Sequence, residues 1–156
     1  MMAVVASLPL APAHGAETTI QASAKVVKSL TLTKKQDLDF GTVTLSGSAG
    51  TYTVSMGMDG LLSCPVGATC AGASTPGIMN VQGSNRSTVR ISVSGASLVN
   101  NLDGTSIAFM PDAPASVTLA NSGFPGTDFN IGGSIQIPAS ADGTYAGTLQ
   151  VTVEYQ

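Results

Sequence analysis

Two cysteines are the residues whose type and spacing most directly suggest chemistry in this sequence. Cys64 and Cys70 stand close together in the run Cys-Pro-Val-Gly-Ala-Thr-Cys, and in an exported protein this spacing predicts a local disulfide. The chain-entropy model gives only about 2 kcal/mol for closing so short a loop, so the bond would stiffen a surface loop and would not replace a core. A metal site is the alternative, but it lacks ligands because the single histidine, His14, lies in a segment that we expect to be cleaved.

A pair of aspartates offers a second possible site. Asp37 and Asp39 are two positions apart on a predicted strand, so their carboxylates share one face. Such a pair can act as acid and base or bind calcium. The alternative is a solvated strand end, partly neutralised by Lys34 and Lys35, and we favour it because the other aspartates stand singly in turns. We therefore predict no cofactor and no metal.

The inventory of charged and basic residues argues against catalysis and against nucleic acid as a partner. Serines are plentiful, but without His14 the chain has no histidine, and no lysine follows a serine in a Ser-x-x-Lys arrangement. Only six lysines and arginines and a net charge of −3 leave no cationic surface for phosphate backbones or anionic lipid. Asn85-Arg86-Ser87 matches a glycosylation acceptor, but such matches are common in turns, and we assign it no function. We expect a protein that is not an enzyme.

Alternating apolar residues predict strands along the whole chain, and no helical periodicity is present. The predicted strands cover residues 18–33, 37–43, 50–56, 78–82, 87–94, 106–110, 116–120, 129–137 and 144–155. Residues 57–77 form the longest predicted irregular stretch, and Gly132-Gly133 predicts a bulge or bend. The pattern predicts one domain over residues 16–156, an all-β, immunoglobulin-like antiparallel β-sandwich. A closed barrel has the same strand spacing and stays open as an alternative.

The N-terminal segment predicts export. Residues 1–15 contain an apolar run followed by small residues from Ala13 to Gly15, which is typical of a signal peptide and its cleavage site. The run is short, is interrupted by prolines and has no basic residue before it, so we expect a truncated signal start and no membrane insertion. The mature chain would begin near Ala16 or Glu17 and be secreted.

The last predicted strand, residues 144–155, is the most regular element. Its apolar face holds Tyr145, Gly147, Leu149, Val151, Val153 and Tyr155, and its other face is mostly polar. Leaving even half of these side chains exposed would forgo several kcal/mol, at about 1.5–3 kcal/mol for each fully buried side chain. An unpaired last strand would also present an edge that recruits other chains.

Three parts of the sequence carry a family resemblance: Leu38-Asp39-Phe40-Gly41-Thr42-Val43, Pro138 and residues 143–155. Over most of the mature chain they resemble a family of secreted bacterial domains of unknown function. The chain is also similar to the pilin subunits of chaperone-usher fimbriae, including the spore coat protein U group, which have a Phe-Gly motif after the first strand. These subunits also have a penultimate tyrosine, here Tyr155, and a glycine before an alternating last strand, here Gly143.

The resemblance to fimbrial subunits implies a function and a set of partners. In those subunits an immunoglobulin-like sandwich lacks its last strand, and the N-terminal extension of the next subunit fills the gap. The chain would then be a structural subunit of an extracellular, cell-surface fibre assembled by donor-strand exchange. Its partners would be neighbouring subunits, a periplasmic chaperone and an outer-membrane usher.

The resemblance also assigns roles to residues. Residues 17–27 would be the donor strand, and its inserted side chains would be Ile20, Ala22, Ala24 and Val26. The acceptor strand would carry Gly143, Tyr145, Leu149, Val151, Val153 and Tyr155. Many fimbrial subunits join their first two strands by a disulfide, whereas both cysteines here fall in one later loop.

Two alternatives stay open at the level of the sequence. In the first, residues 18–33 pair with the last strand of their own chain, which makes the sandwich self-sufficient. In the second, the chain is a secreted monomeric binding module that recognises a glycan or protein through its loops. The absence of tryptophan weakens a sugar-stacking surface in that second case.

Overall fold

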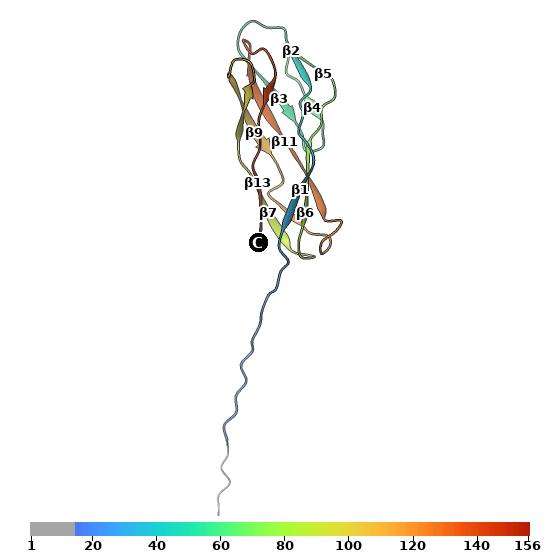
Figure 1. Ribbon diagram of the computed structural model, residues 1–156, viewed down its shortest axis with the longest axis vertical. Coiled ribbons are helices and arrows are strands. Elements are labelled where there is room, and N and C mark those ends of the chain that lie inside the picture. The colour runs from blue at the N-terminus through green and yellow to red at the C-terminus, as the bar shows by residue number, and fades with distance from the viewer. Residues whose placement is uncertain (1–14) are drawn as a thin grey trace, which may run out of the picture.

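The computed structural model describes residues 15–156, so the predicted signal peptide lies outside the described residues except for Gly15. Within this range the chain consists of strands and loops, and no helix long and apolar enough to cross a membrane is present. Figure 1 shows an elongated body of strands with an N-terminal extension that leaves one end of it. The named strand pairs are all antiparallel, which confirms the prediction of an all-β antiparallel sandwich.

The strands are β1 (Thr31–Gln36), β2 (Thr42–Leu45), β3 (Thr51–Met56), β4 (Leu62–Ser63), β5 (Ala68–Ala71), β6 (Gly77–Gln82), β7 (Thr88–Val93), β8 (Ala96–Asn100), β9 (Ser106–Asp112), β10 (Ser116–Thr118), β11 (Thr127–Pro138), β12 (Tyr145–Ala146) and β13 (Val151–Tyr155). The large sheet has the order β1-β6-β11-β9-β8-β12, with β3 also paired to β11 and β4 paired to β3. A second sheet has the order β10-β7-β13, and β2 pairs with β5 in a separate ribbon. Consequently β1 and β13 are both edge strands.

The core consists of two adjoining clusters of buried side chains. The first holds Phe40, Val54, Met56, Ile107, Phe109, Ile135 and Ile137. The second holds Val81, Val89, Ile91, Leu119, Phe129 and Ile131. Leu149 packs against both clusters and so joins them. Along β7 the predicted alternation is confirmed, because Val89 and Ile91 are buried and Arg90 is exposed.

Gly132 and Gly133 mark the place where β11 changes its partner. The residues before them pair with β6, and those from Gly133 onward pair with β3. A Cβ atom on Gly132 would overlap the carbonyl oxygen of Met56, and Gly133 has a φ of +148°. Glycine is required because only a residue without Cβ allows the strands to cross this closely. The sequence predicts a bulge or bend at these glycines, but β11 runs through them as one continuous strand, and they mark an exchange of neighbouring strands instead.

The prediction for the first strand is wrong over most of its length. Residues 18–30 form no strand, and β1 begins at Thr31. The alternation of residues 18–30 is genuine, but a strand also needs a neighbouring strand to pair with its backbone, and this segment has no such partner within residues 15–156.

Three further boundaries differ from the prediction. Residues 57–77 contain β4 and β5, whose glycine, alanine and cysteine content gives a weak strand signal. The strand β8 was not predicted. The predicted strand over residues 144–155 is two strands in different sheets, because β12 pairs with β8 and β13 pairs with β7.

Candidate functional site

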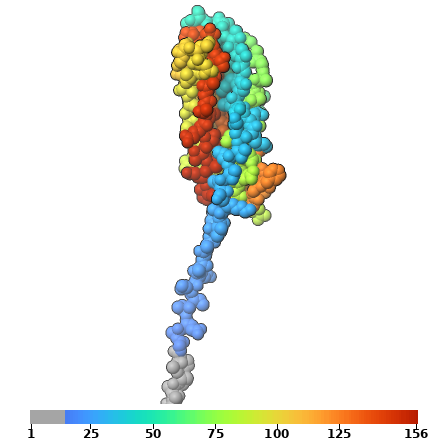
Figure 2. Space-filling view, viewed as in Figure 1, coloured from blue at the N-terminus to red at the C-terminus, as the bar shows by residue number. Residues whose placement is uncertain are grey.

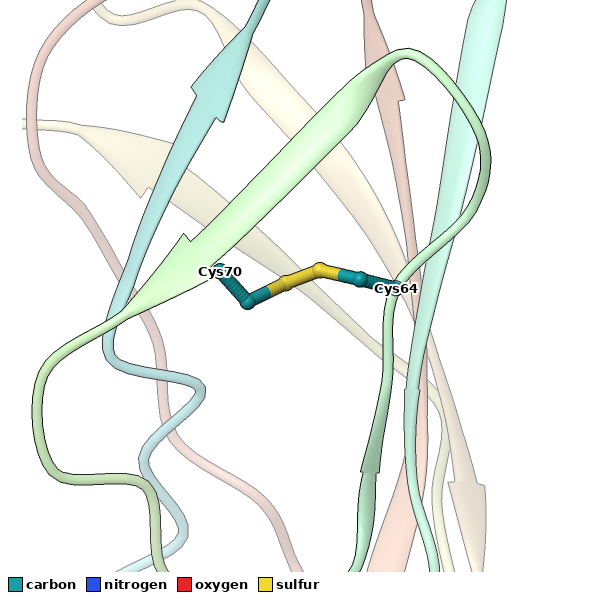
Figure 3. The surroundings of a disulfide bond; sticks show 2 residues. All are labelled: Cys64 and Cys70. Carbon is teal, nitrogen blue, oxygen red and sulfur yellow. A yellow bond between two sulfur atoms is a disulfide. The ribbon is translucent and has the colours of Figure 1, made fainter.

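The predicted disulfide is present between Cys64 and Cys70, with the two Cα atoms 6.2 Å apart. It ties the turn after β4 to strand β5 (Figure 3). Cys70 is half-buried and packs against the first core cluster. With both sulfur atoms bonded to each other, neither cysteine is a free nucleophile.

The aspartate pair stabilises a turn. The carboxylate of Asp37 accepts a hydrogen bond from Lys34 Nζ at 2.8 Å, and both side chains are exposed. The carboxylate of Asp39 accepts a hydrogen bond from the backbone N–H of Gly41 at 2.8 Å. These contacts fit the solvated strand end that the sequence favours. Among residues 15–156 no group of three or more His, Cys, Asp or Glu side chains is arranged to hold a metal ion.

The N-terminal extension, residues 15–29, projects from the body and is hydrogen-bonded to it through the backbone of Lys28. Each of its residues is exposed and none belongs to a strand. Of the predicted donor side chains, Ile20 is 92% exposed and Val26 is 90% exposed. The alternative pairing of this segment with the last strand of the same chain does not occur in the structure, because β13 pairs with β7 and β1 pairs with β6.

A groove with a cavity of about 510 Å³ lies between β1 with the residues that follow it and the segment of residues 147–151, which leads into the edge strand β13. Figure 2 shows these two strands, blue and red, next to each other along one face of the body. The groove is lined by Lys34, Gln36, Asp37, Leu38 and Phe40 on one side, by residues 147–151 on the other, and by Gly77, Met79, Leu98, Phe109 and Ile131. Its lining is largely apolar and reaches the aromatic residues of the core.

Four of the predicted acceptor residues form one apolar strip that begins in this groove. Leu149 and Val151 line it, and Val153 and Tyr155 continue the strip over the second core cluster. All four side chains are half-buried, and the residues between them are exposed, so the predicted alternation is confirmed.

The other two predicted acceptor residues lie outside this strip. Tyr145 is in β12 and packs against the first cluster. Gly143 precedes β12, has a φ of +105° and passes beside the side chain of Asn100.

The hydroxyl of Tyr155 connects the C-terminal strand to the base of the extension. Tyr155 Oη donates a hydrogen bond to the carbonyl oxygen of Lys28 at 2.6 Å and accepts one from the backbone N–H of Ser84 at 2.7 Å. The backbone N–H of Lys28 in turn donates to Ser84 Oγ at 2.7 Å. Sequence reasoning identified Tyr155 but missed Lys28 and Ser84, because nothing local in the sequence marks partners so far apart.

Two aspartates with a lowered pKa lie away from the groove. Asp128 accepts hydrogen bonds from Asn80 Nδ2 and from Lys35 Nζ, and these two contacts, the first being the larger, lower the pKa of its carboxyl group. The pKa of Asp103 is lowered by hydrogen bonds from Thr105. Neither of these aspartates lines the groove, whose lining combines apolar side chains with the exposed pair of Lys34 and Asp37.

These features define an all-β sandwich with an open groove between two unpaired strand edges. The chain belongs to the family described as a domain of unknown function (DUF4402), whose sequence model matches residues 30–155. The matched region contains both strands that flank the groove. No curated protein and no solved structure matches the chain.

Proposed function

We propose that this chain is a structural, non-catalytic subunit of an extracellular, pilus-like fibre, in which residues 17–27 of one copy complete the groove of the next copy by strand addition. One observation carries the proposal: the same chain has an unpaired N-terminal segment with alternating apolar residues and an unpaired groove with a matching strip of half-buried ones.

The two sides of the groove present backbone hydrogen-bonding groups and apolar side chains that an added strand would pair with and cover. The outer edges of β1 and β13 each carry backbone N–H and C=O groups that a third strand between them could satisfy. The side chains of Leu149 and Val151 would be covered by the same strand. Burial of two large side chains of the donor, Ile20 and Val26, adds about 1.5–3 kcal/mol each.

The lengths of donor and acceptor agree. Residues 17–27 extend over roughly 35 Å at about 3.3 Å per residue, and the strip from residue 149 to residue 155 measures roughly 20 Å on the same basis. The donor segment is therefore long enough to cover the strip and to continue past it along Leu38 and Phe40.

The positions of the extension and the groove favour an open chain of subunits. The extension leaves the body at the end where β1 begins and β13 finishes, and it points away from the body (Figure 1). Insertion into another copy joins two different surfaces, a heterologous contact that repeats without closing. The proposal includes export through the periplasm, capture of the open groove by a chaperone strand, and delivery by an outer-membrane usher.

Deletion of residues 17–27 tests the donor assignment. Because these residues contact little of the body, the shortened chain should fold cooperatively and stay monomeric, while the full chain assembles into filaments visible by electron microscopy. Adding a peptide of residues 17–27 should then raise the thermal midpoint of the shortened chain by several degrees. A peptide with Ala22→Asp and Ala24→Asp is the matched control and should leave the midpoint unchanged. Assembly of the shortened chain would show that the donor lies elsewhere.

A further inference from the structure

A ring of three hydrogen bonds at the base of the extension has no role in the strand addition itself. Lys28 contributes its backbone N–H and C=O, Ser84 its backbone N–H and hydroxyl, and Tyr155 its hydroxyl. We call this ring the clasp. It joins three parts of the chain that are far apart in sequence: the extension, the loop between β6 and β7, and the end of β13.

The hydroxyl group of Tyr155 fits beside Gly83 only because that residue has no side chain. Gly83 is buried beside it, and a Cβ atom there would overlap Tyr155 Oη and approach side-chain atoms of Leu30 and Leu119 to 2.8 Å. Tyr155 itself packs on the second core cluster, so its ring is held and its hydroxyl is aimed at Lys28. The position of the hydroxyl is therefore fixed by packing as well as by its own hydrogen bonds.

The clasp and the core together fix the direction in which the extension leaves the body. Both backbone hydrogen-bonding groups of Lys28 are engaged, and Leu30, two residues later, packs on the second core cluster. For the extension to enter its own groove, the chain would have to reverse direction and run back along β1. A turn before Lys28 would use up residues of the donor segment itself, so the whole segment could enter only with a turn between these two anchors. Such a turn would break the hydrogen bonds of Lys28.

This restriction matters because insertion of the extension into its own groove would otherwise compete strongly with insertion into a second copy. A tethered segment experiences an effective concentration in the millimolar range when its linker spans the site, and close to zero when the geometry forbids it. Separate subunits at micromolar concentration would lose that competition by roughly a thousandfold if the extension could turn back freely. An arrangement that prevents the chain from turning back keeps both the extension and the groove free to bind a second copy.

We propose that the clasp of Lys28, Ser84 and Tyr155 holds the extension out of its own groove and thereby directs it to a second copy of the chain. The role of the clasp in assembly rests on the proposed function. The conformational claim, that the clasp keeps the extension of a monomer exposed, is independent of assembly and can be measured alone.

Amide hydrogen exchange of residues 17–27 in the monomer tests the clasp. The chain lacking its predicted signal peptide is examined at a dilution at which size-exclusion chromatography shows a monomer. In the wild-type chain these amides should exchange at the rate of an unstructured peptide. Tyr155→Phe removes the hydroxyl and keeps the ring, and Ser84→Ala removes the hydroxyl that binds Lys28. Each variant should shift the ratio of inserted to exposed extension by several-fold to roughly tenfold, seen as slower exchange.

Tyr145→Phe is the matched control. It removes the hydroxyl of another half-buried tyrosine, whose contact is Thr105 Oγ1 and which does not touch the extension. Its exchange should equal that of the wild type. Two results would overturn the clasp: an extension that stays unprotected in both Tyr155→Phe and Ser84→Ala, or one that is already protected in the wild-type monomer. A wild-type chain that never assembles would instead contradict the proposed function and leave the exchange result valid.

Discussion

Asp128 is the side chain that links the first strand, the sixth strand and the start of β11. Its carboxylate accepts hydrogen bonds from Asn80 Nδ2, which also donates to the carbonyl oxygen of Pro125, and from Lys35 Nζ at 2.6 Å. Lys35 and Asp128 are both about half exposed, so solvent screens the ion pair. Asn80 is buried, and its hydrogen bond has the larger effect on the carboxyl group.

The lowered pKa of Asp128 predicts a defined loss of stability in acid. A carboxyl group whose pKa is lower in the folded state stabilises the fold above its ordinary pKa of 3.8, and this contribution disappears as the pH falls through the folded value. The thermal midpoint of the wild type should therefore exceed that of Asp128→Ala at pH 6. The difference should shrink steadily below about pH 4. Calorimetry over a series of pH values measures it.

Lys35→Met is the companion variant for this titration. It removes the hydrogen bond and the charge of Lys35 and leaves the hydrogen bond from Asn80, so the difference from the wild type should depend on pH in the same direction but less strongly. A difference between wild type and Asp128→Ala that stays constant from pH 6 to pH 2 would mean that the carboxylate contributes through packing alone.

At the scale of the elements, β11 organises the fold because it pairs with three other strands. It pairs with β6 along its first half and with β3 and β9 along its second half. Gly132 is the position at which this exchange of partners requires the closest approach of two backbones. The integrity of the large sheet thus depends on one residue that carries no side chain.

Gly132→Ala should therefore be destabilising. The added methyl group would overlap a backbone carbonyl, which cannot rotate away as a side chain can, so we expect the free energy of unfolding to fall by about 1–3 kcal/mol. Gly95→Ala is the control, because its nearest contact would be an ordinary 3.7 Å. Urea denaturation measures both. Equal stability of the two variants would contradict the close approach at Gly132.

At the scale of the whole molecule, the extension and the groove form complementary halves of a proposed intermolecular contact. The extension contributes little to the stability of its own body because residues 15–29 are exposed. Substitutions in it should therefore separate assembly from folding. Such substitutions can therefore test directly which face of the extension enters the groove.

Ala24→Asp and Ser23→Asp place the same charge on neighbouring residues of opposite parity. If Ala24 enters the groove, its aspartate would be buried without a partner, and filament yield should drop at least tenfold. Ser23→Asp would leave its charge in solvent, and filament yield should stay near that of the wild type. The thermal midpoint of the monomer should be the same for all three chains, because both positions are exposed. Equal yields for the two variants would contradict the assigned donor face.

Much of the fold follows from the sequence because strand alternation and turn residues are local signals. The faces of β7 and of residues 149–155 and the disulfide between Cys64 and Cys70 were predictable in this way. Strands β5 and β8 were missed, and the strand predicted over residues 37–43 lies over Thr42–Leu45 as β2, since pairing with a neighbour is what makes these segments strands.

Local pattern by itself determined which residues alternate and which face each one takes, and hence the all-β class of the protein. Only the tertiary structure decided which strands become neighbours: it left residues 15–29 unpaired, split the last predicted strand between two sheets, and opened a groove between β1 and β13. It also brought Lys28, Ser84 and Tyr155 together across long separations in sequence. The reason is physical: the direction of a side chain is set by its own backbone, whereas a hydrogen-bonded neighbour is selected by competition among all strands of the folded chain.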